Sequence, residues 1–383
     1  MQQGLENISL MKSGINNMFD SKHYIPILKW KRAEQGALKA LRGDQKKYIT
    51  PLIQFVMPKY KPSEKLELEN VVARFKEQAS QIPEKIIEVW GITHVFIDVS
   101  LLFTTSLKAE SIKNISLGGH KLRGVFIPVI HLNDDQEIKD AACSAAKETK
   151  SGICLRLICS DFSDSDSTKL NQDINNLLSS NKLMEKDVDL LVDIKETEDY
   201  NGNKYIKYLD LSQSISNLTK WRTFIFASGS FPEDLSQCKI DEENLIPRID
   251  WKSWKEQINS KKIQRKPSFA DYTIQHPIYK EISQFFHPTS SIKYTLGDDW
   301  LIMKGQRQKF DKYLASAALL VEDKRYYGKN FSDGDKYIAE KAKHFAVYVK
   351  KPSVKGTGST ETWLRAGINH HLVLAAHQVA NLS

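Results

Sequence analysis

Short apolar runs alternate with helix-like stretches along most of the chain. The runs are rich in β-branched residues and apolar nearly throughout, which is typical of parallel strands that are covered on both faces. They occupy residues 24–31, 49–55, 94–99, 124–130, 152–158, 188–194, 222–228 and 267–273. Eight strand–helix units over about 260 residues predict an α/β fold, a TIM-like (β/α)8 barrel. An open, doubly wound sheet is the alternative, and a strand at 246–251 would move the point of closure.

The pattern divides the chain into three parts. Residues 1–22 form a polar N-terminal tail, 23–285 form the barrel, and 286–383 form a mostly helical C-terminal extension. In the extension, helical spacing puts one apolar stripe on a single face: Leu364, Ile368, Leu372, Ala375 and Val379. A one-sided stripe needs a partner surface, so we expect the extension to pack on the barrel.

Composition narrows the class of protein. The 383 residues are 41% hydrophobic and 27% charged, as in ordinary folded proteins, which excludes collagenous and disordered classes. No apolar segment has the length of a signal sequence or membrane span, so no membrane contact is expected. The four cysteines lack C-x-x-C and zinc-ligand spacing, which favours reduced thiols in a cytoplasmic protein without a disulfide framework. The net charge of +8 favours an anionic partner, such as a nucleotide or nucleic acid.

Charged residues interrupt or end several of the apolar runs. Lys29, Asp98, Arg156, Asp193 and Asp271 lie near the carboxyl ends of predicted strands, where barrels carry their chemistry. A charge in a doubly covered strand is costly unless it is paired or belongs to a site. These five residues are the predicted catalytic group around a bound anion, and salt bridges that fill the barrel mouth are the alternative.

A metal is a weaker possibility for the same carboxylates. Asp98, Asp193 and Asp271 would suit Mg²⁺, which prefers oxygen ligands. The sequence predicts no other metal site. It contains no Walker loop, G-x-G-x-x-G, H-E-x-x-H, nucleophile elbow or kinase signature, and nothing indicates a nicotinamide or flavin cofactor.

A small-residue turn follows the seventh run. Ser228, Gly229 and Ser230 lead to Pro232, which suits the first turn of a helix. Backbone N–H groups at a helix N-terminus bind phosphate, and barrels often use the loop after strand seven for this purpose. Lys31, two positions after Lys29, would lie on the same strand face and add a charge. These four residues, Lys31 and Ser228 to Ser230, are the predicted phosphate-binding group, and an ordinary turn is the alternative.

Four segments together resemble the bacterial and phage "beta protein" family. They are YIPILKWK at 24–31 with Glu34, FADYTIQHP at 269–277, FSDGD at 331–335 and WLRAGINHH at 363–371. The resemblance covers about residues 23–380 and implies a protein of phages or of bacterial mobile or defence-associated loci. It implies no activity and no catalytic residues, so whether the protein is an enzyme stays open.

Two functions are therefore expected as alternatives. The first is a phage- or defence-associated cytoplasmic barrel that binds, and acts on, a phosphate-bearing ligand. The second is a non-enzymatic anti-phage defence component that binds a phage or host protein.

Overall fold

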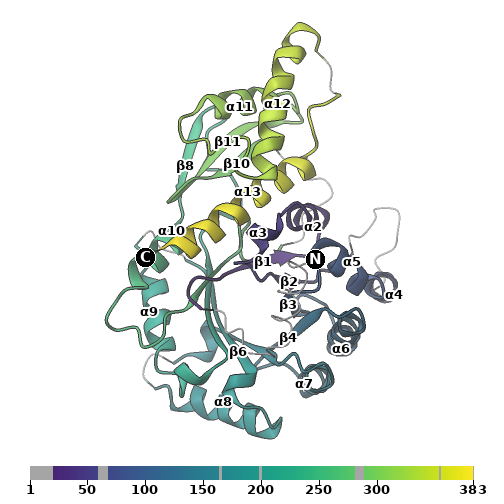
Figure 1. The fold of residues 1–383 in the computed structure, drawn as a ribbon, viewed down its shortest axis with the longest axis vertical. Coiled ribbons are helices and arrows are strands. Elements are labelled where there is room, and N and C mark those ends of the chain that lie inside the picture. Colours follow the sequence, from purple (N-terminus) through teal and green to yellow (C-terminus); the bar gives the residue numbers. More distant parts are fainter. Residues whose placement is uncertain are drawn as a thin grey trace, which may run out of the picture.

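Eight parallel strands close into a barrel in the order β1-β2-β3-β4-β5-β6-β7-β9 (Figure 1). The structure is a computed structural model that describes residues 20–58, 68–163, 166–197, 201–280, 289–352 and 355–382. The predicted polar tail lies outside the described residues as far as residue 19. The barrel strands are β1 (Tyr24–Lys29), β2 (Leu52–Gln54), β3 (His94–Asp98), β4 (Val125–His131), β5 (Ile153–Ile158), β6 (Val188–Glu196), β7 (Thr223–Gly229) and β9 (Ser268–Asp271).

Helices cover the outside of the barrel between successive strands. They are α2 (Arg32–Lys39), α3 (Gly43–Lys46), α4 (Leu68–Ala79), α5 (Ile82–Val89), α6 (Thr105–Lys121), α7 (Gln136–Thr149), α8 (Thr168–Ser180), α9 (Asn203–Ser212) and α10 (Ile249–Gln257). The predicted (β/α)8 barrel is thus confirmed. The open-sheet alternative is wrong, because β1 pairs with β9 as well as with β2.

Both faces of each barrel strand are buried, which explains the near-continuous apolar runs. In β4, Ile127 and Val129 point into the barrel, where they join an inner cluster of apolar side chains. Their neighbours Phe126 and Ile130 point outward and pack in the layer between strands and helices. The inner cluster fills the lower part of the barrel as side-chain layers fill TIM barrels.

The C-terminal part forms a second lobe above the barrel in Figure 1. Its antiparallel sheet has the order β10-β11-β8, from β10 (Thr289–Thr295), β11 (Asp299–Arg307) and β8 (Glu243–Pro247). The sequence did not predict this sheet. The strand considered at 246–251 is partly present as β8, but it pairs with β11 in the lobe and leaves the closure of the barrel unchanged. Helices make up most of the extension: α11 (Lys312–Glu322), α12 (Asp333–Lys350) and α13 (Thr360–Asn381).

Helix α13 joins the lobe to the barrel. It runs between the two in Figure 1 and contacts α2 and β1 on one side and α12 and β10 on the other. It is buried nearly all round, since Ile368, Leu372 and Ala375 are joined in the interior by residues of the other faces, such as Asn369 and Val373. No helix in the described part of the chain is long and apolar enough to cross a membrane.

Candidate functional site

Polar side chains replace apolar ones at the carboxyl end of the barrel interior. In β1, Ile25 and Ile27 belong to the inner apolar cluster, and the next inward position is Lys29. The same step occurs on β3, where Asp98 follows Phe96. We call the resulting group the mouth cluster: Lys29, Gln54, Asp98, Arg156, Asp193, Lys195 and Tyr272. All its members except Lys195 are 3% exposed or less.

Arg156 is the centre of the mouth cluster and is fully buried. Its guanidinium forms ion pairs with Asp98 and Asp193, and Nε lies 3.1 Å from Asp193 Oδ2. Nη2 also donates a hydrogen bond of 2.8 Å to the Tyr272 hydroxyl. Gln54 Nε2 donates to Asp98 Oδ2 at 3.0 Å. A fork of donors between two carboxylates is the geometry for which arginine is suited.

The charges around the two carboxyls keep both ionised. Burial raises the pKa of Asp98, but the charge of Arg156, together with His131 and the hydrogen bonds from Ser100, outweighs it and holds the pKa at about 2. Burial likewise opposes ionisation of Asp193, yet Lys195 and Arg156 hold its pKa below the ordinary value. Ion pairs and hydrogen bonds therefore compensate the desolvation of both carboxylates.

Lys195 lies two positions after Asp193 and four after the inward-facing Leu191, so the alternation of β6 directs it toward the barrel interior. The pairing of β6 with β7 shifts register between Asp193 and Glu196, and Lys195 has a left-handed φ of 59°. Its Nζ lies 3.0 Å from Asp193 Oδ2 and 3.0 Å from the Tyr272 hydroxyl. Bulges are frequent next to active sites, where they re-aim a side chain, and a left-handed non-glycine residue costs about 1 kcal/mol or more. With its side chain 34% exposed, Lys195 is the cluster member that solvent reaches most.

Lys29 lacks an acidic partner of this kind. Its side chain is 3% exposed, its Nζ lies 3.5 Å from the carbonyl oxygen of His276, and it lies 4.9 Å from the centroid of the Tyr272 ring. It forms no ion pair with any residue that the structure describes. Burial, together with the nearby charge of Lys195, lowers the pKa of Lys29 to about 7. Near neutral pH a large fraction of this amine is therefore uncharged.

Of the predicted catalytic group, Lys29, Asp98, Arg156 and Asp193 lie together, and Asp271 does not. The Asp271 carboxylate faces away from the interior, where it accepts a hydrogen bond from the Tyr24 hydroxyl and lies 2.8 Å from His371 Nε2. Successive residues of a strand point to opposite faces. Ala270 and Tyr272 take the inward positions on this strand, so Asp271 must point outward.

The predicted phosphate-binding residues are scattered. The Ser230 hydroxyl donates to Asp250 at 2.7 Å, and the Ser228 hydroxyl is buried on the outer face of β7 with no hydrogen-bond partner among the described residues. Gly229 does reach the mouth, since a Cβ there would lie 3.2 Å from the Tyr272 ring. Lys31 lies past the end of β1, at the start of α2, with its Nζ 4.5 Å from the centroid of the Tyr279 ring.

The helix that motivated the phosphate prediction is absent. Residues 231–242 form turns after β7, and the next regular element is β8. Pro232 therefore begins no helix, and no helix N-terminus faces Gly229 from this segment.

The carboxylates proposed for Mg²⁺ do not converge either. Asp98 and Asp193 are both bound to Arg156, and Asp271 lies on the opposite face of the barrel wall. Within the described ranges, no three His, Cys, Asp or Glu side chains are arranged to hold a metal ion.

Three members of the mouth cluster were not predicted as site residues: Gln54, Lys195 and Tyr272. Tyr272 lies two positions after Ala270, so the alternation of the strand places it inward. That alternation is hidden in the sequence because Phe269 and Ala270 are both apolar. Lys195 lies two positions after Asp193, and this spacing is the signal that would have placed it on the same face of the strand.

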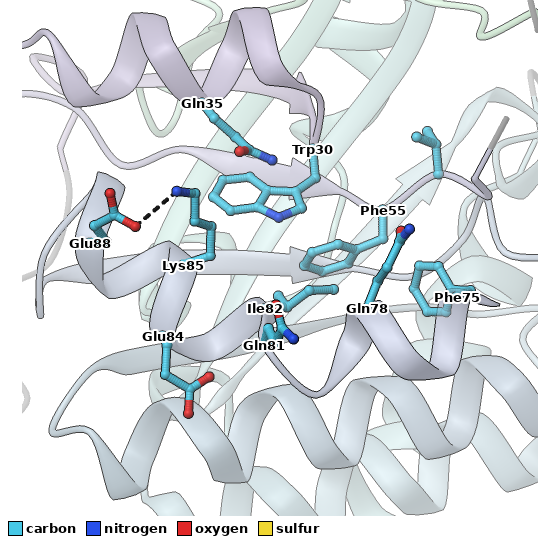
Figure 2. A pocket seen from close by; sticks show the side chains of 11 residues that line it. Trp30, Gln35, Phe55, Phe75, Gln78, Gln81, Ile82, Glu84, Lys85 and Glu88 are labelled. Atoms are coloured by element: carbon cyan, nitrogen blue, oxygen red, sulfur yellow. Dashed lines mark hydrogen bonds and ion pairs between the residues drawn. The ribbon is translucent and has the colours of Figure 1, made fainter. Parts of the chain in front are cut away.

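A separate cavity of about 570 Å³ opens outside the barrel (Figure 2). Trp30 and Phe55 line it, and they directly follow the inward-facing Lys29 and Gln54, so they point to the outer side. Figure 2 shows them facing Phe75 and Ile82 of α4 and α5. This outer groove is therefore distinct from the mouth cluster.

Comparison with known families gives a match that covers nearly the whole chain. A family model described as "Beta protein" matches residues 24–377, a range that includes every strand of the barrel and most of α13. None of the curated proteins matches the chain.

Proposed function

This chain belongs to the Beta protein family, and we propose that it is a phage- or defence-associated cytoplasmic protein that binds, and acts on, a phosphate-bearing ligand at its barrel mouth. The ligand class is a nucleotide or the phosphate of a nucleic acid. The phage or defence context follows from the family resemblance. The ligand class follows from the charges of the mouth cluster.

The excess of cations over carboxylates carries the proposal. Arg156 and Lys195 carry positive charge at the mouth, and Lys29 adds to it in the fraction of molecules in which its amine is protonated, whereas Asp98 and Asp193 supply the only two carboxylates of the cluster. Both carboxylates are already engaged by Arg156. A bound anion would supply the missing negative charge, and at partial burial such an attraction is stronger than in bulk water.

Lys195 is the residue expected to contact the anion first, because it is partly exposed and held in place by Asp193 and Tyr272. The test is isothermal titration calorimetry with inorganic phosphate, pyrophosphate and ATP at low and high salt. In Lys195→Met we expect about tenfold weaker binding, equivalent to about 1.4 kcal/mol. Affinity should also fall with added salt.

Lys255 offers a matched control. Its side chain is 33% exposed and pairs with the single carboxylate of Asp298 at 2.7 Å, much as Lys195 pairs with Asp193. Lys255→Met should leave anion affinity unchanged. Equal weakening by the two substitutions, or no binding of any of the three anions by the unaltered protein, would contradict the proposal.

The second candidate is a protein-binding defence component, and the outer groove favours it. An apolar cavity on the barrel wall, rimmed by polar side chains, suits an apolar side chain of a partner protein. Gln81→Arg would fill this groove from an exposed position without removing a packed side chain. Phage plating on cells that express the unaltered protein, Lys195→Met or Gln81→Arg separates the candidates. Loss of protection only in Gln81→Arg favours the groove, and loss only in Lys195→Met favours the mouth.

A further inference from the structure

The mouth cluster contains two lysines in different surroundings. Lys195 is ion-paired with Asp193 at 3.0 Å and hydrogen-bonded to Tyr272, which favours its ammonium form, although burial and the charge of Arg156 lower its pKa. Lys29 is buried against the face of the Tyr272 ring and one backbone carbonyl, at 4.9 Å and 3.5 Å. Both amines thus lie next to one tyrosine, Lys195 at its hydroxyl and Lys29 over its ring. Lys195 is held by a carboxylate, and Lys29 has no ion pair among the described residues.

This pair of lysines supplies two groups that imine formation needs, a nucleophilic amine and a nearby proton donor. We infer that Lys29 is a nucleophilic lysine, which forms an imine with a carbonyl compound whose phosphate group is held at the mouth. The inference rests on the proposed function, because the anion site would hold the carbonyl compound near Nζ. A buried amine next to another cationic group is a known way to activate lysine as a nucleophile.

The charged groups around Lys29 favour its neutral form. Burial has the largest effect on its pKa, and the charges of Lys195, Arg156 and Lys31 lower it further. Glu34 is the acidic group that acts in the opposite direction, but burial raises the pKa of Glu34 too, and its Oε1 accepts a hydrogen bond from Gln275. The resulting pKa of about 7 leaves a free amine at neutral pH.

The reaction balances with groups that are present. The lone pair of Nζ forms the new C–N bond to the carbonyl carbon, while the π electrons move to oxygen, which takes a proton from the Lys195 ammonium. One proton of the new nitrogen passes to the Lys195 amine and restores its ammonium, which gives the neutral carbinolamine. The carbinolamine hydroxyl takes a proton from this ammonium and departs as water, and the second proton of the nitrogen returns to Lys195. Nothing is oxidised or reduced: amine and carbonyl give imine and water. The Tyr272 hydroxyl, 3.0 Å from Lys195 Nζ and 2.7 Å from Asp193 Oδ2, links the proton-carrying groups.

Lys293 is a matched internal control. It is half-buried, its Nζ donates a hydrogen bond to one carbonyl, that of Ile274, at 3.3 Å, and it lies 4.5 Å from the centroid of the Phe231 ring. Burial lowers its pKa to about 8. It lies at the contact of the barrel with the lobe, without a tyrosine–lysine pair beside it. At pH 8 Lys29 is therefore largely neutral and Lys293 about half neutral. The main difference between the two lysines is that only Lys29 lies in the mouth cluster.

The experiment uses two probes that differ only in the phosphate, glycolaldehyde phosphate and glycolaldehyde, each with cyanoborohydride at pH 8. Peptide mapping by mass spectrometry then locates the reduced adduct in the full chain. A pKa of about 7 gives about 300-fold more neutral amine at pH 8 than an ordinary lysine has. We expect Lys29 to be labelled ahead of Lys293 and of the surface lysines, and labelling to be faster with the phosphate probe. Lys29→Met should abolish the fast phase, and Lys293→Met should preserve it.

The outcomes separate this inference from the function on which it rests. Binding of inorganic phosphate without selective labelling of Lys29 would overturn the imine and keep the anion site. Equal labelling of Lys29 by both probes, without phosphate binding, would keep the reactive lysine and overturn the anion site. Labelling of Lys293 as fast as Lys29 in the unaltered protein would overturn the inference even if Lys29→Met failed to fold.

Discussion

Replacing Arg156 by methionine tests whether the mouth cluster is a buried ion network. Met has a similar length but no charge, so Asp98 and Asp193 would remain buried with one cation removed. Asp193 would keep Lys195 at 3.0 Å. Asp98 would keep neutral donors, among them Gln54 Nε2 at 3.0 Å and the Ser100 backbone N–H at 2.8 Å, and the weaker influence of His131. The larger penalty therefore falls on Asp98.

The size of the effect follows from the unpaired carboxylate. Removing one partner of a buried ion pair costs about 3–5 kcal/mol of unfolding free energy, and we expect a loss in this range at pH 7. The loss should shrink in acid. In the unaltered protein the pKa of Asp98 is lowered to about 2, so its stabilisation is present above the unfolded value of about 3.9 and lost as the pH falls toward 2.

In Arg156→Met the pH dependence of stability has the opposite sign. An unpaired buried carboxyl has a raised pKa, so Asp98 of the folded variant stays protonated to a higher pH than in the unfolded chain. The variant therefore loses stability as the pH rises above about 3.9. The difference between the two proteins should thus be smaller at pH 5 than at pH 8, by about 1.4 kcal/mol for each unit in which only the variant titrates. Urea unfolding at both pH values, followed by circular dichroism, measures it.

Two further variants control the measurement. Arg222 forms a similar pair with Asp189 at the opposite end of the barrel, with Nε 2.9 Å from Oδ1. Arg222→Met should also destabilise the fold but should leave anion binding intact. Adding Asp98→Asn to Arg156→Met should recover part of the stability at pH 8. A loss that is the same at pH 5 and pH 8, or no recovery in the double variant, would refute the reasoning.

Three other predictions concern the packing around the site. Asp271→Asn should lower the unfolding free energy by about 1–3 kcal/mol, because Asp271 bonds both Tyr24 and His371, while phosphate affinity by calorimetry stays the same; a lost affinity would return Asp271 to the site. Deletion of residues 360–382 should expose barrel surface and cause aggregation on size exclusion; a monomer with an unchanged melting temperature would show that α13 is not needed. Gly334→Ala should lower stability by about 1–3 kcal/mol, since a Cβ would lie 2.1 Å from the Ala366 carbonyl oxygen, whereas Gly43→Ala meets no atom within 4 Å and should not; equal melting temperatures would contradict this.

The barrel was predictable because strands that are buried on both faces leave a strong signal. The same property hides which residues face inward. In a half-exposed strand a polar residue marks the outer face, but Phe269 and Ala270 are both apolar and give no such mark. The sequence therefore placed Asp271 in the site, where the structure has Tyr272. The lobe sheet was missed for a different reason, since β8 and β11 are far apart in sequence and become strands through pairing with each other.

Helix α13 connects the lobe with strand β9, which lies next to the mouth cluster. His370 and His371 are adjacent on this helix, but one side chain points to the lobe and the other to the barrel. His370 lies 2.8 Å from Asp335 Oδ2 in the lobe, and His371 lies 2.8 Å from Asp271 Oδ2 in the barrel. The backbone N–H of Thr273, a left-handed residue with a φ of 59°, donates to the same Asp271 carboxylate at 2.9 Å. Tyr272 stands between these two fixed residues, so the packing of α13 determines where its hydroxyl meets Arg156 and Lys195. A change at the lobe interface should therefore alter the geometry of the mouth without touching it.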